Sequence, residues 1–389
     1  MREAVVISGA RTPIARENGA LRDVPPEKYG ALVISEAVNR AGIDPATVDQ
    51  VVMGHCLGAV GCMARVAWLE AGFPFSVPCL TIDRQCGSGS EAVNLAAALI
   101  MAGYAEIVVA GGVESMTRMP YLLEKTASPY QRSAPVFIQP RPLSPKQIGD
   151  PPMGITAENV AEKYKISRED QDAFGLASQQ KAERAIREGR FKEQIVPIVI
   201  PQKKGEPVVF DTDEHPRFGT TLEALAKLPA VFKKDGTVTA GTSSGINDGA
   251  GALVIMERGK AEALGLKSMG VIRAAAAAGV DPNIMGIGPV PATRLALKRA
   301  GITVDDLDVI EMNEAFAAQA LACVRELGLN MDKVNPNGGA IALGHPIAGS
   351  LAILTVKLIY ELQRQRARYG LVTACCGGGQ GVATIIERT

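Results

Sequence analysis

An internal repeat places the strongest constraint on how this chain folds. Residues 41–53 match residues 300–312 at several positions. Both segments contain Ala-Gly-Ile, then an apolar residue followed by Asp, then two apolar residues of a predicted strand, and each matching position is offset by 259 residues. Residues 107–110 likewise match residues 371–374, with an offset of 264. In each copy a helix pattern ends at glycine and a strand pattern follows. Two matches in the same order predict duplicated halves, although helix–glycine–strand units also recur by chance in α/β proteins.

Apolar segments of strand length alternate with segments of helical periodicity in this sequence. Residues 4–8, 51–53 and 107–110 are predicted to be buried strands, whereas residues 29–41 and 90–102 have the apolar spacing of helices. This alternation predicts an α/β fold with largely parallel strands.

The middle of the chain differs from both halves. Residues 127–152 contain seven prolines, which predicts a long irregular loop at the surface. Residues 167–188 form a charged amphipathic pattern that opens with a Ser167–Asp170 capping box. We therefore expect an insertion between two halves, with residues 1–117 and 246–268 in the first half, 118–245 in the inserted loop domain and 269–389 in the second half.

Charge and composition exclude several classes of protein. The chain of 389 residues balances 41 basic against 41 acidic side chains, whereas proteins that neutralise nucleic-acid phosphates usually carry a basic excess. The most apolar window, residues 95–102, is too short to span a bilayer, and the N-terminal residues show no leader pattern. We expect a cytoplasmic protein with no nucleic-acid or membrane partner.

Only three histidines and seven cysteines are available for catalysis or metal binding. An odd number of cysteines in a chain of this length indicates reduced thiols rather than disulfide staples. The spacings of these residues contain no Cys-x-x-Cys or His-x-x-x-His pair, so no metal site is expected.

Cys86 lies in a glycine-rich turn, R-Q-C-G-S-G at residues 84–89, between a predicted strand and a predicted helix. A Ser88–Glu91 capping box would start that helix near Ser88. The amides and the macrodipole at a helix N-terminus favour an anion and lower the pKa of a thiol placed there. Cys86 is therefore a candidate nucleophile, with a buried structural cysteine as the alternative.

His345 ends the segment G-G-A-I-A-L-G-H and precedes Pro346 and a predicted helix over residues 350–366. His345 lies between a glycine and a proline, so the backbone and not side-chain packing fixes its position. It is therefore a candidate acid–base group. The alternative is a structural histidine, buried in the core with its ring nitrogens hydrogen-bonded. His55 and His215 are expected to be structural or exposed.

Two further turns carry polar or reactive groups. Asn313 follows the predicted strand over residues 308–312, where it caps the next helix or presents an amide at the edge where α/β ligand sites form. Cys375 opens the turn C-C-G-G-G-Q-G, whose free N–H groups would cradle a phosphate or line an oxyanion site beside the thiol.

Taken together, these motifs resemble the thiolase family. The matching segments are C-G-S-G at Cys86, N-E-A-F-A from Asn313, G-G-A-I-A-L-G-H-P through His345 and C-C-G-G-G-Q-G from Cys375, with family-like segments at residues 7–13, 153–161 and 238–250. The resemblance implies an α/β thiolase fold, with two duplicated halves in a five-layered αβαβα arrangement plus a loop domain. It also implies an acyltransferase, a homodimer or homotetramer, that joins two acetyl-CoA or cleaves a 3-ketoacyl-CoA through an acyl-cysteine.

The resemblance implies a role for each residue in these motifs. Cys86 would be the nucleophile that takes the acyl group, and His345 would remove its thiol proton. Cys375 would exchange a proton with the acetyl-CoA methyl group. Asn313 would anchor a water that, with His345, stabilises the enolate, and the N–H groups of Cys86 and Gly377 would form a second oxyanion hole.

The resemblance also implies contacts with coenzyme A, which enters as a substrate and not as a permanently bound cofactor. Arg217 would lie near its nucleotide and Ser244 beside its pantetheine arm, while the pocket would be lined by Met153, Met285 and Phe316. Positions that depart from the family pattern include Ser90, Pro152, Leu351 and Arg84, which follows Asp83 where asparagine is common. Proline replaces the histidine of the acetoacetyl-specific branch at position 152, which weakens the case for strict acetoacetyl specificity, and leucine at position 351 is expected to narrow the space behind the nucleophile.

Two alternatives remain open on the same motifs. A β-ketoacyl synthase-type decarboxylative condensing enzyme requires two catalytic histidines, and here a cysteine occupies the second place. A catalytically silent acyl-CoA-binding protein predicts eroded motifs, whereas all four motifs are intact.

Overall fold

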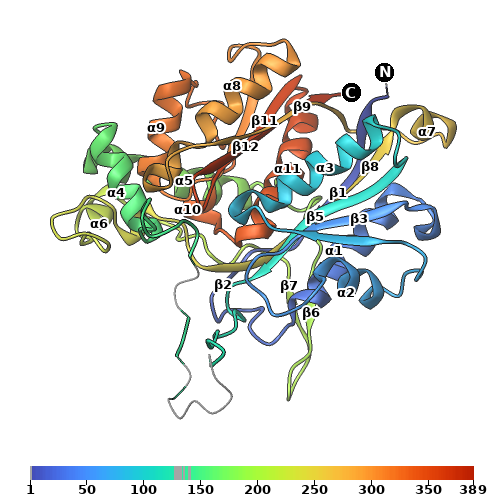
Figure 1. The fold of residues 1–389 in the computed structure, drawn as a ribbon, viewed down its shortest axis with the longest axis horizontal. Helices are drawn as coiled ribbons and strands as arrows, with labels where there is room; N and C mark the ends of the chain where they lie inside the picture. The colour runs from blue at the N-terminus through green and yellow to red at the C-terminus, as the bar shows by residue number, and fades with distance from the viewer. Residues whose placement is uncertain (1, 127–133, 135, 139–141) are drawn as a thin grey trace.

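Two half-sheets form the centre of the protein, in a computed structural model that describes residues 2–126, 134, 136–138 and 142–389 (Figure 1). The first has the strand order β4-β3-β5-β8-β1 and the second β10-β11-β12-β9. In the described residues, the strand pairing that joins them is that of β1 with β9, at Val5–Val271 and Val6–Gly270. Their strands are β1 (Ala4–Arg11), β3 (Gln50–Gly54), β4 (Cys79–Ile82), β5 (Ile107–Ser115), β8 (Asn247–Glu257), β9 (Gly270–Gly279), β10 (Leu307–Met312), β11 (Tyr369–Cys376) and β12 (Gln380–Arg388).

The half-sheets place the two copies of the repeat at equivalent positions. β3 and β10 carry the 259-residue match, and β5 and β11 carry the 264-residue match. The order β3-β5-β8-β1 in one half therefore corresponds to β10-β11-β12-β9 in the other. The helices before β3 and β10 both end at a left-handed glycine, Gly42 with φ 65° and Gly301 with φ 70°, which explains the glycine in the repeat.

Strand direction differs from the sequence-based prediction. β3 runs parallel to β4 and β5, and β10 runs parallel to β11. The remaining pairings along the path are antiparallel, so the prediction of largely parallel strands was wrong. A short turn at residues 377–379 joins β11 to β12, and a connection that short permits only antiparallel pairing.

Five layers result from the packing of helices on the half-sheets (Figure 1). The central layer holds α3 (Ser88–Met101) and α11 (Ile347–Gln365), which share one apolar cluster with strands of both halves. α1 (Pro26–Ala41) and α2 (Met63–Glu70) cover the outer face of the first half-sheet. α8 (Pro289–Ala300) and α9 (Ala317–Leu327) cover the outer face of the second.

The inserted segment lies beside these layers. It contains α4 (Met153–Lys163), α5 (Arg168–Arg187), the hairpin of β6 (Ile198–Ile200) and β7 (Val208–Phe210), and α6 (Leu222–Ala226). Ser167 Oγ accepts a hydrogen bond from Asp170 N, which confirms the predicted N-cap of α5. The shorter elements β2 (Ala15–Arg16), α7 (Arg258–Ala263) and α10 (Ala340–Leu343) complete the chain. The proposed division into residues 1–117 with 246–268, 118–245 and 269–389 stays a prediction.

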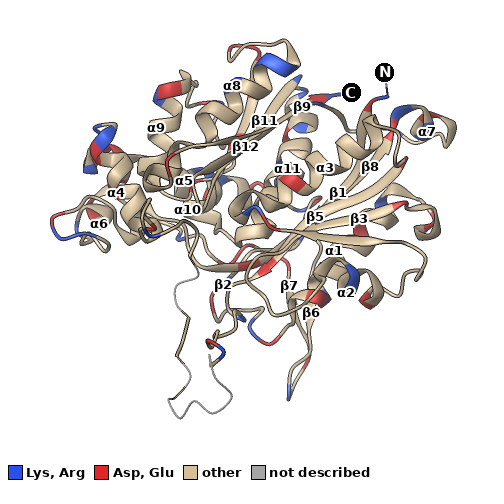
Figure 2. Cartoon of the chain, in the orientation of Figure 1, with Lys and Arg blue, Asp and Glu red and all other residues tan. Residues whose placement is uncertain are grey.

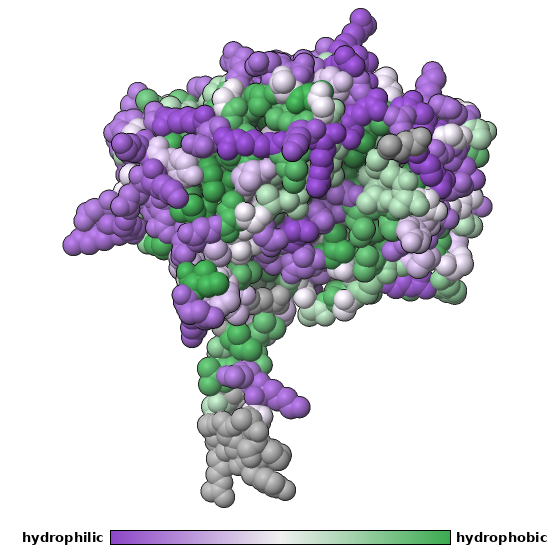
Figure 3. Space-filling model, turned by 45° about the horizontal axis from the view of Figure 1, so that its top comes forward, coloured by the Kyte–Doolittle hydropathy of each residue, from purple (hydrophilic) through white to green (hydrophobic). Residues whose placement is uncertain are grey.

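The predicted proline-rich loop falls partly outside the described residues, which exclude 127–133, 135 and 139–141. Leu123 and Phe137 form an antiparallel bridge. Exposed apolar side chains of the described residues on either side of 127–133 include Met119, Tyr121, Leu123, Val136 and Phe137. Figure 3 shows a projection that carries hydrophobic surface. Charged residues lie mostly in the outer helices and loops (Figure 2).

In the described part of the chain, no helix has the length and apolar composition needed to cross a membrane.

Candidate active site

Two turns, one from each half, bring Cys86 and His345 together at the start of the central helices. Cys86 lies in a 3₁₀ turn, Gln85–Gly87, that runs directly into α3, and His345 lies between α10 and α11. Its Nε2 is 3.1 Å from Cys86 Sγ. The two residues are 259 positions apart, which is the offset of the repeat. Equivalent turns of the duplicated halves therefore supply the thiol and the imidazole.

The Cys86 turn is held in an uncommon conformation. Gln85 has a φ of 49°, and Asp83 Oδ1 accepts hydrogen bonds from its backbone N at 2.8 Å and its Nε2 at 2.9 Å. Left-handed backbone at a non-glycine residue costs about 1–3 kcal/mol, so the Asp83 contacts compensate for strain beside the thiol. Ser88 Oγ donates to Gln85 O at 2.7 Å and accepts from Arg84 N at 2.8 Å.

These contacts show that the predicted Ser88–Glu91 capping box was wrong. Because the 3₁₀ turn continues into α3, Ser88 already has helical backbone angles, φ −56° and ψ −41°. Its hydroxyl therefore turns back into the Cys86 turn, and Glu91 pairs with Arg84 at 3.2 Å.

Burial governs the protonation of the thiol and the imidazole. Burial raises the pKa of Cys86 to about 11, although the N–H groups of Gly377 and of Cys86 itself oppose this shift. The expectation of a lowered thiol pKa was therefore wrong, because desolvation of the thiolate outweighs the helix N-terminus. Burial also lowers the pKa of His345 to about 4. At neutral pH the pair is a neutral thiol facing a neutral imidazole.

Two residues that the sequence-based prediction missed hold His345 in place. Ser350 Oγ, on the first turn of α11, lies 2.6 Å from His345 Nδ1. Asn247 Oδ1, on β8 of the other half, accepts a hydrogen bond from His345 N at 2.9 Å. Asn247 lies in the family-like segment at residues 238–250, and Ser350 follows the G-H-P motif by four residues, so both had a local signal.

Asn313 lies directly beside the imidazole. Its Nδ2 is 3.4 Å from His345 Nε2, and its buried Oδ1 has no hydrogen-bond partner among the described residues. The alternative that Asn313 caps the next helix was wrong, because α9 begins at Ala317 with Phe316 as its N-cap. Residues 313–316 therefore lie between the end of β10 and the start of α9, which leaves the Asn313 amide at the strand edge.

Cys375 and Gly377 approach the same point from the end of β11. Cys375 is fully buried in an apolar cluster, and that burial raises its pKa well above the ordinary value, with a further contribution from Cys86. The cluster consists of Ala157, Val238, Met285, Ala315, Phe316 and Cys375, with Met153 packed against it. The Gly377 N–H contacts the Cys86 sulfur. A neutral thiol and a backbone donor thus flank Cys86.

A cleft of about 720 Å³ opens in front of Cys86. Its lining is mostly apolar: Leu57, Met116, Met119, Pro120, Leu122, Ile138, Pro142, Leu143, Met153 and Ile347 accompany Asp83, Gln85, Cys86 and Gly377. Met153 therefore lines the cleft, whereas Met285 and Phe316 pack around Cys375, and the contacts of all three with substrate stay predictions.

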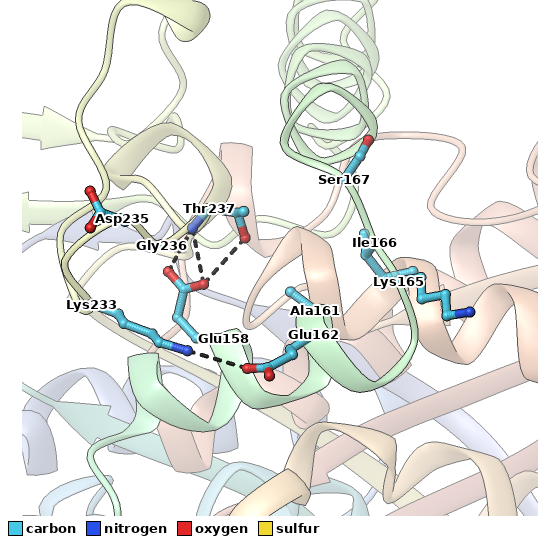
Figure 4. A pocket seen from close by; sticks show the side chains of 10 residues that line it. All are labelled: Glu158, Ala161, Glu162, Lys165, Ile166, Ser167, Lys233, Asp235, Gly236 and Thr237. Atoms are coloured by element: carbon cyan, nitrogen blue, oxygen red, sulfur yellow. Dashed lines mark hydrogen bonds and ion pairs between the residues drawn. The ribbon is translucent and has the colours of Figure 1, made fainter.

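The two residues predicted to contact coenzyme A at its polar parts lie outside this lining. Ser244 is half-buried and donates its N–H to Ala315 O at 3.0 Å. Arg217 is exposed. A second hollow of about 390 Å³ lies where α4 meets residues 233–237 (Figure 4). Glu158 there accepts hydrogen bonds from the N–H groups of Thr237 and Val238, and the hollow contains none of the predicted site residues.

Ser90 and Leu351, two of the residues that depart from the family pattern, do not line the cleft. Ser90 Oγ bonds Thr384 Oγ1 at 2.7 Å and so ties α3 to β12 of the other half. Leu351 is buried in the cluster between α3 and α11. Pro152 precedes α4 and sets the start of the helix that carries Met153.

The other two histidines have structural contacts. Burial opposes protonation of His55, but the hydrogen bond and the charge of Glu114, 3.1 Å away, raise its pKa. His215 is half-buried, and its Nδ1 lies 3.4 Å from Asn247 Nδ2. Neither histidine is exposed. Among the described residues, no group of three or more His, Cys, Asp or Glu side chains could hold a metal ion.

Comparison with known proteins identifies the family of this arrangement. Residues 4–259 match the model of the thiolase N-terminal domain, and residues 266–388 match that of the thiolase C-terminal domain. The chain belongs to the thiolase family. An acetyl-CoA acetyltransferase of Pseudomonas aeruginosa is 49% identical over 392 residues, with 100% of both chains covered. A 3-oxoadipyl-CoA/3-oxo-5,6-dehydrosuberyl-CoA thiolase of Escherichia coli is 49% identical over 401 residues, again covering 100% of each.

Solved structures agree with this assignment. The Bacillus anthracis acetyl-CoA acetyltransferase has a TM-score of 0.95 at 45% identity and covers 100% of this chain and 99% of its own. Human mitochondrial 3-ketoacyl-CoA thiolase has a TM-score of 0.94 at 41% identity, with the same coverage. The predicted thiolase fold, the thiolase reaction class and the acyltransferase activity are thereby confirmed.

Proposed function

We propose that this thiolase transfers acyl groups between coenzyme A thioesters through an acyl-Cys86 intermediate. The observation that carries the proposal is the neutral Cys86–His345 pair, with Sγ and Nε2 3.1 Å apart at the end of an apolar cleft. A neutral imidazole accepts the thiol proton as sulfur attacks a thioester carbonyl. The N–H groups of Cys86 and Gly377 then donate to the developing oxyanion.

Proton transfer through Cys375 completes the first half-reaction. Because its buried thiol is neutral, Cys375 is suited to protonate the departing coenzyme A sulfur. The products of this step are acyl-Cys86, a protonated His345, a Cys375 thiolate and free coenzyme A. No proton is gained or lost from solvent, and the two new charges lie in the same buried site.

The second half-reaction uses those charges. The Cys375 thiolate removes a proton from the α-carbon of a second acetyl thioester, and the enolate carbon attacks the acyl group on Cys86. His345 and Asn313, the latter through a water, stabilise the enolate oxygen, which is consistent with the unpartnered Oδ1 of Asn313. Cys86 leaves as a thiolate and recovers its proton from His345. Thiolysis is the reverse sequence.

For coenzyme A itself, we propose that Arg217 meets the nucleotide phosphates and that Ser244 and Met153 contact the pantetheine arm. Arg217 is exposed and able to reach solvent-borne phosphates. Met285 and Phe316 shield Cys375 from water. We further propose a cytoplasmic homodimer or homotetramer in fatty acid metabolism, and the exposed apolar side chains around Leu123 and Phe137 support an oligomer.

The apolar lining of the cleft supports acyl groups longer than acetyl. Thiolysis rates across short, long and aryl 3-ketoacyl-CoA substrates test this point. We expect kcat/KM for a medium-chain substrate to equal or exceed that for acetoacetyl-CoA. A strict preference for acetoacetyl-CoA would overturn it.

The acyl-cysteine intermediate is tested with Cys86→Ala. Wild-type enzyme incubated with acetyl-CoA should gain one acetyl group, located at Cys86 by peptide mass spectrometry, and the variant should gain none. Cys376→Ala is the matched control, because Cys376 is buried beside the same turn and has no role in the proposed steps. Acylation and turnover by Cys86→Ala would refute the proposed function.

A further inference from the structure

The hydrogen bonds on His345 differ between its two ring nitrogens. Nε2 faces two donors, the neutral Cys86 thiol at 3.1 Å and Asn313 Nδ2 at 3.4 Å. A nitrogen that faces two donors carries its lone pair, so the ring proton is on Nδ1. Nδ1–H therefore donates to Ser350 Oγ, 2.6 Å away.

We propose that Ser350 is a positioning residue that fixes the tautomer and the orientation of His345, so that Nε2 stays available to accept the Cys86 proton. Its hydroxyl lies on the first turn of α11, a 19-residue helix packed between the two half-sheets. Ser350 is 4% exposed and His345 is 7% exposed, so water does not compete freely for Nδ1.

The wrong tautomer would stop general-base catalysis. With hydrogen on Nε2 and a lone pair on Nδ1, the imidazole faces the Cys86 thiol with a donor, and the thiol proton has no acceptor. When the correct tautomer takes that proton, Ser350 Oγ also stabilises the imidazolium through Nδ1–H. The contacts of His345 within the described part of the chain include no carboxylate that could do this instead.

Few charged groups surround this pair. Glu114 on β5 and Asp83 before the Cys86 turn act on the charge of Cys86, and Cys375 on β11 is the other thiol beside it. Behind Ser350, a small enclosed space of about 10 Å³ reaches Lys357, whose Nζ is paired with Glu311 Oε2 at 2.8 Å. Lys357 Nζ thus donates to Glu311 and to Gly338 O, and the Ser350 hydroxyl is the group that contacts His345 Nδ1.

The proposal rests on the proposed function and is tested by the pH dependence of Cys86 reactivity in Ser350→Ala. Two rates are measured: acetylation by acetyl-CoA, and alkylation of Cys86 by iodoacetamide, followed by peptide mass spectrometry. In wild type, both rates should be flat between about pH 5 and 9, because the pKa of His345 is about 4 and that of Cys86 about 11. In Ser350→Ala, both rates should fall about 10- to 100-fold at pH 7 and rise tenfold per pH unit, because the thiolate must then form by reaction with hydroxide.

Two controls separate positioning from packing. Thr355→Val removes another buried hydroxyl of α11, one that donates only to Leu351 O at 2.6 Å, and should leave both profiles flat. Ser350→Thr keeps the Oγ atom and should restore a flat profile. A flat profile in Ser350→Ala, whatever its height, would overturn the proposal. If wild-type enzyme is not acetylated at all, the proposed function fails, while the alkylation profiles still decide the role of Ser350.

Discussion

The turn that carries Cys86 and the turn that carries His345 occupy equivalent places in the two halves, yet they are held by different means. Both immediately precede a central helix, and they lie 259 residues apart. The backbone of the Cys86 turn is braced from within its own half by Asp83 and Ser88, and the Arg84 side chain also donates to Gln380 Oε1 of the other half at 2.8 Å. The His345 turn is braced across the halves by Asn247, and from its own helix by Ser350.

This difference suits the task of each group. A nucleophile must remain open to the substrate, so the Cys86 turn is fixed from behind and its thiol ends at the cleft. A base must keep one ring nitrogen aimed at one sulfur, so the His345 turn is fixed at its backbone and at Nδ1. Duplication supplied two similar turns, and their separate hydrogen bonds produced a thiol on one and its base on the other.

Of the changes that test this difference between the two turns, removal of the base should have the largest effect on activity. His345→Ala should lower kcat/KM for thiolysis by about 10²- to 10⁴-fold, because the Cys86 thiol then has no proton acceptor. Rates at saturating and limiting substrate, together with acetyl-enzyme formation, measure the loss. His55→Ala removes a histidine that has no contact with Cys86 and should retain far more activity. Equal losses in the two variants would contradict the special role of the His345 turn.

A methyl group at Gly344 should disturb the backbone that holds the base. Gly344 has a φ of 106°, and an added Cβ would lie 2.5 Å from the Asn247 side chain. We expect Gly344→Ala to lower the free energy of unfolding by about 2–3 kcal/mol and to reduce kcat. Gly42→Ala, also at positive φ but in open space, should cost about 1 kcal/mol and leave kcat unchanged. Chemical denaturation and steady-state rates measure both effects.

Acid should destabilise the protein through histidines near the base turn. The pKa values of His345 and His215 are lowered to about 4, chiefly by burial. Between the ordinary value near 6.5 and pH 4, the unfolded state binds protons that the folded state does not, so stability falls as pH falls. Each group contributes a slope of about 1.4 kcal/mol per pH unit in that window. His215→Gln should remove the contribution of His215 to that slope in denaturation curves measured between pH 6.5 and 4.5.

The smallest expected effect concerns the contact between α3 and the opposite half. Ser90→Ala removes a buried hydroxyl that bonds Thr384 and should lower stability by about 1–2 kcal/mol. The acyl-chain preference should not change, because Ser90 does not line the cleft. Ser268→Ala, at an exposed hydroxyl, should stay within about 0.5 kcal/mol of wild type. A change of substrate preference in Ser90→Ala would show that α3 shapes the acyl site.

The sequence predicted more of the site than of the sheet. Cys86, His345 and Cys375 were each found because a glycine-rich turn beside a strand or helix is a local signal. The antiparallel centre of the sheet was missed because the directions of β8 and β12 depend on the connections that precede them. A long insertion precedes β8, and a short turn precedes β12. The pKa of Cys86 was predicted in the wrong direction because burial, unlike a helix N-terminus, has no pattern in neighbouring residues.

The sequence by itself determined the duplication, the thiol and imidazole turns and the family to which the chain belongs, since repeats and turn motifs are short-range features. Only the tertiary structure decided that residues 259 positions apart meet at 3.1 Å, that the pair is neutral and that Ser350 and Asn247 hold the base. Those properties depend on the two halves packing against α3 and α11, because burial and cross-half hydrogen bonds arise only when distant segments come together.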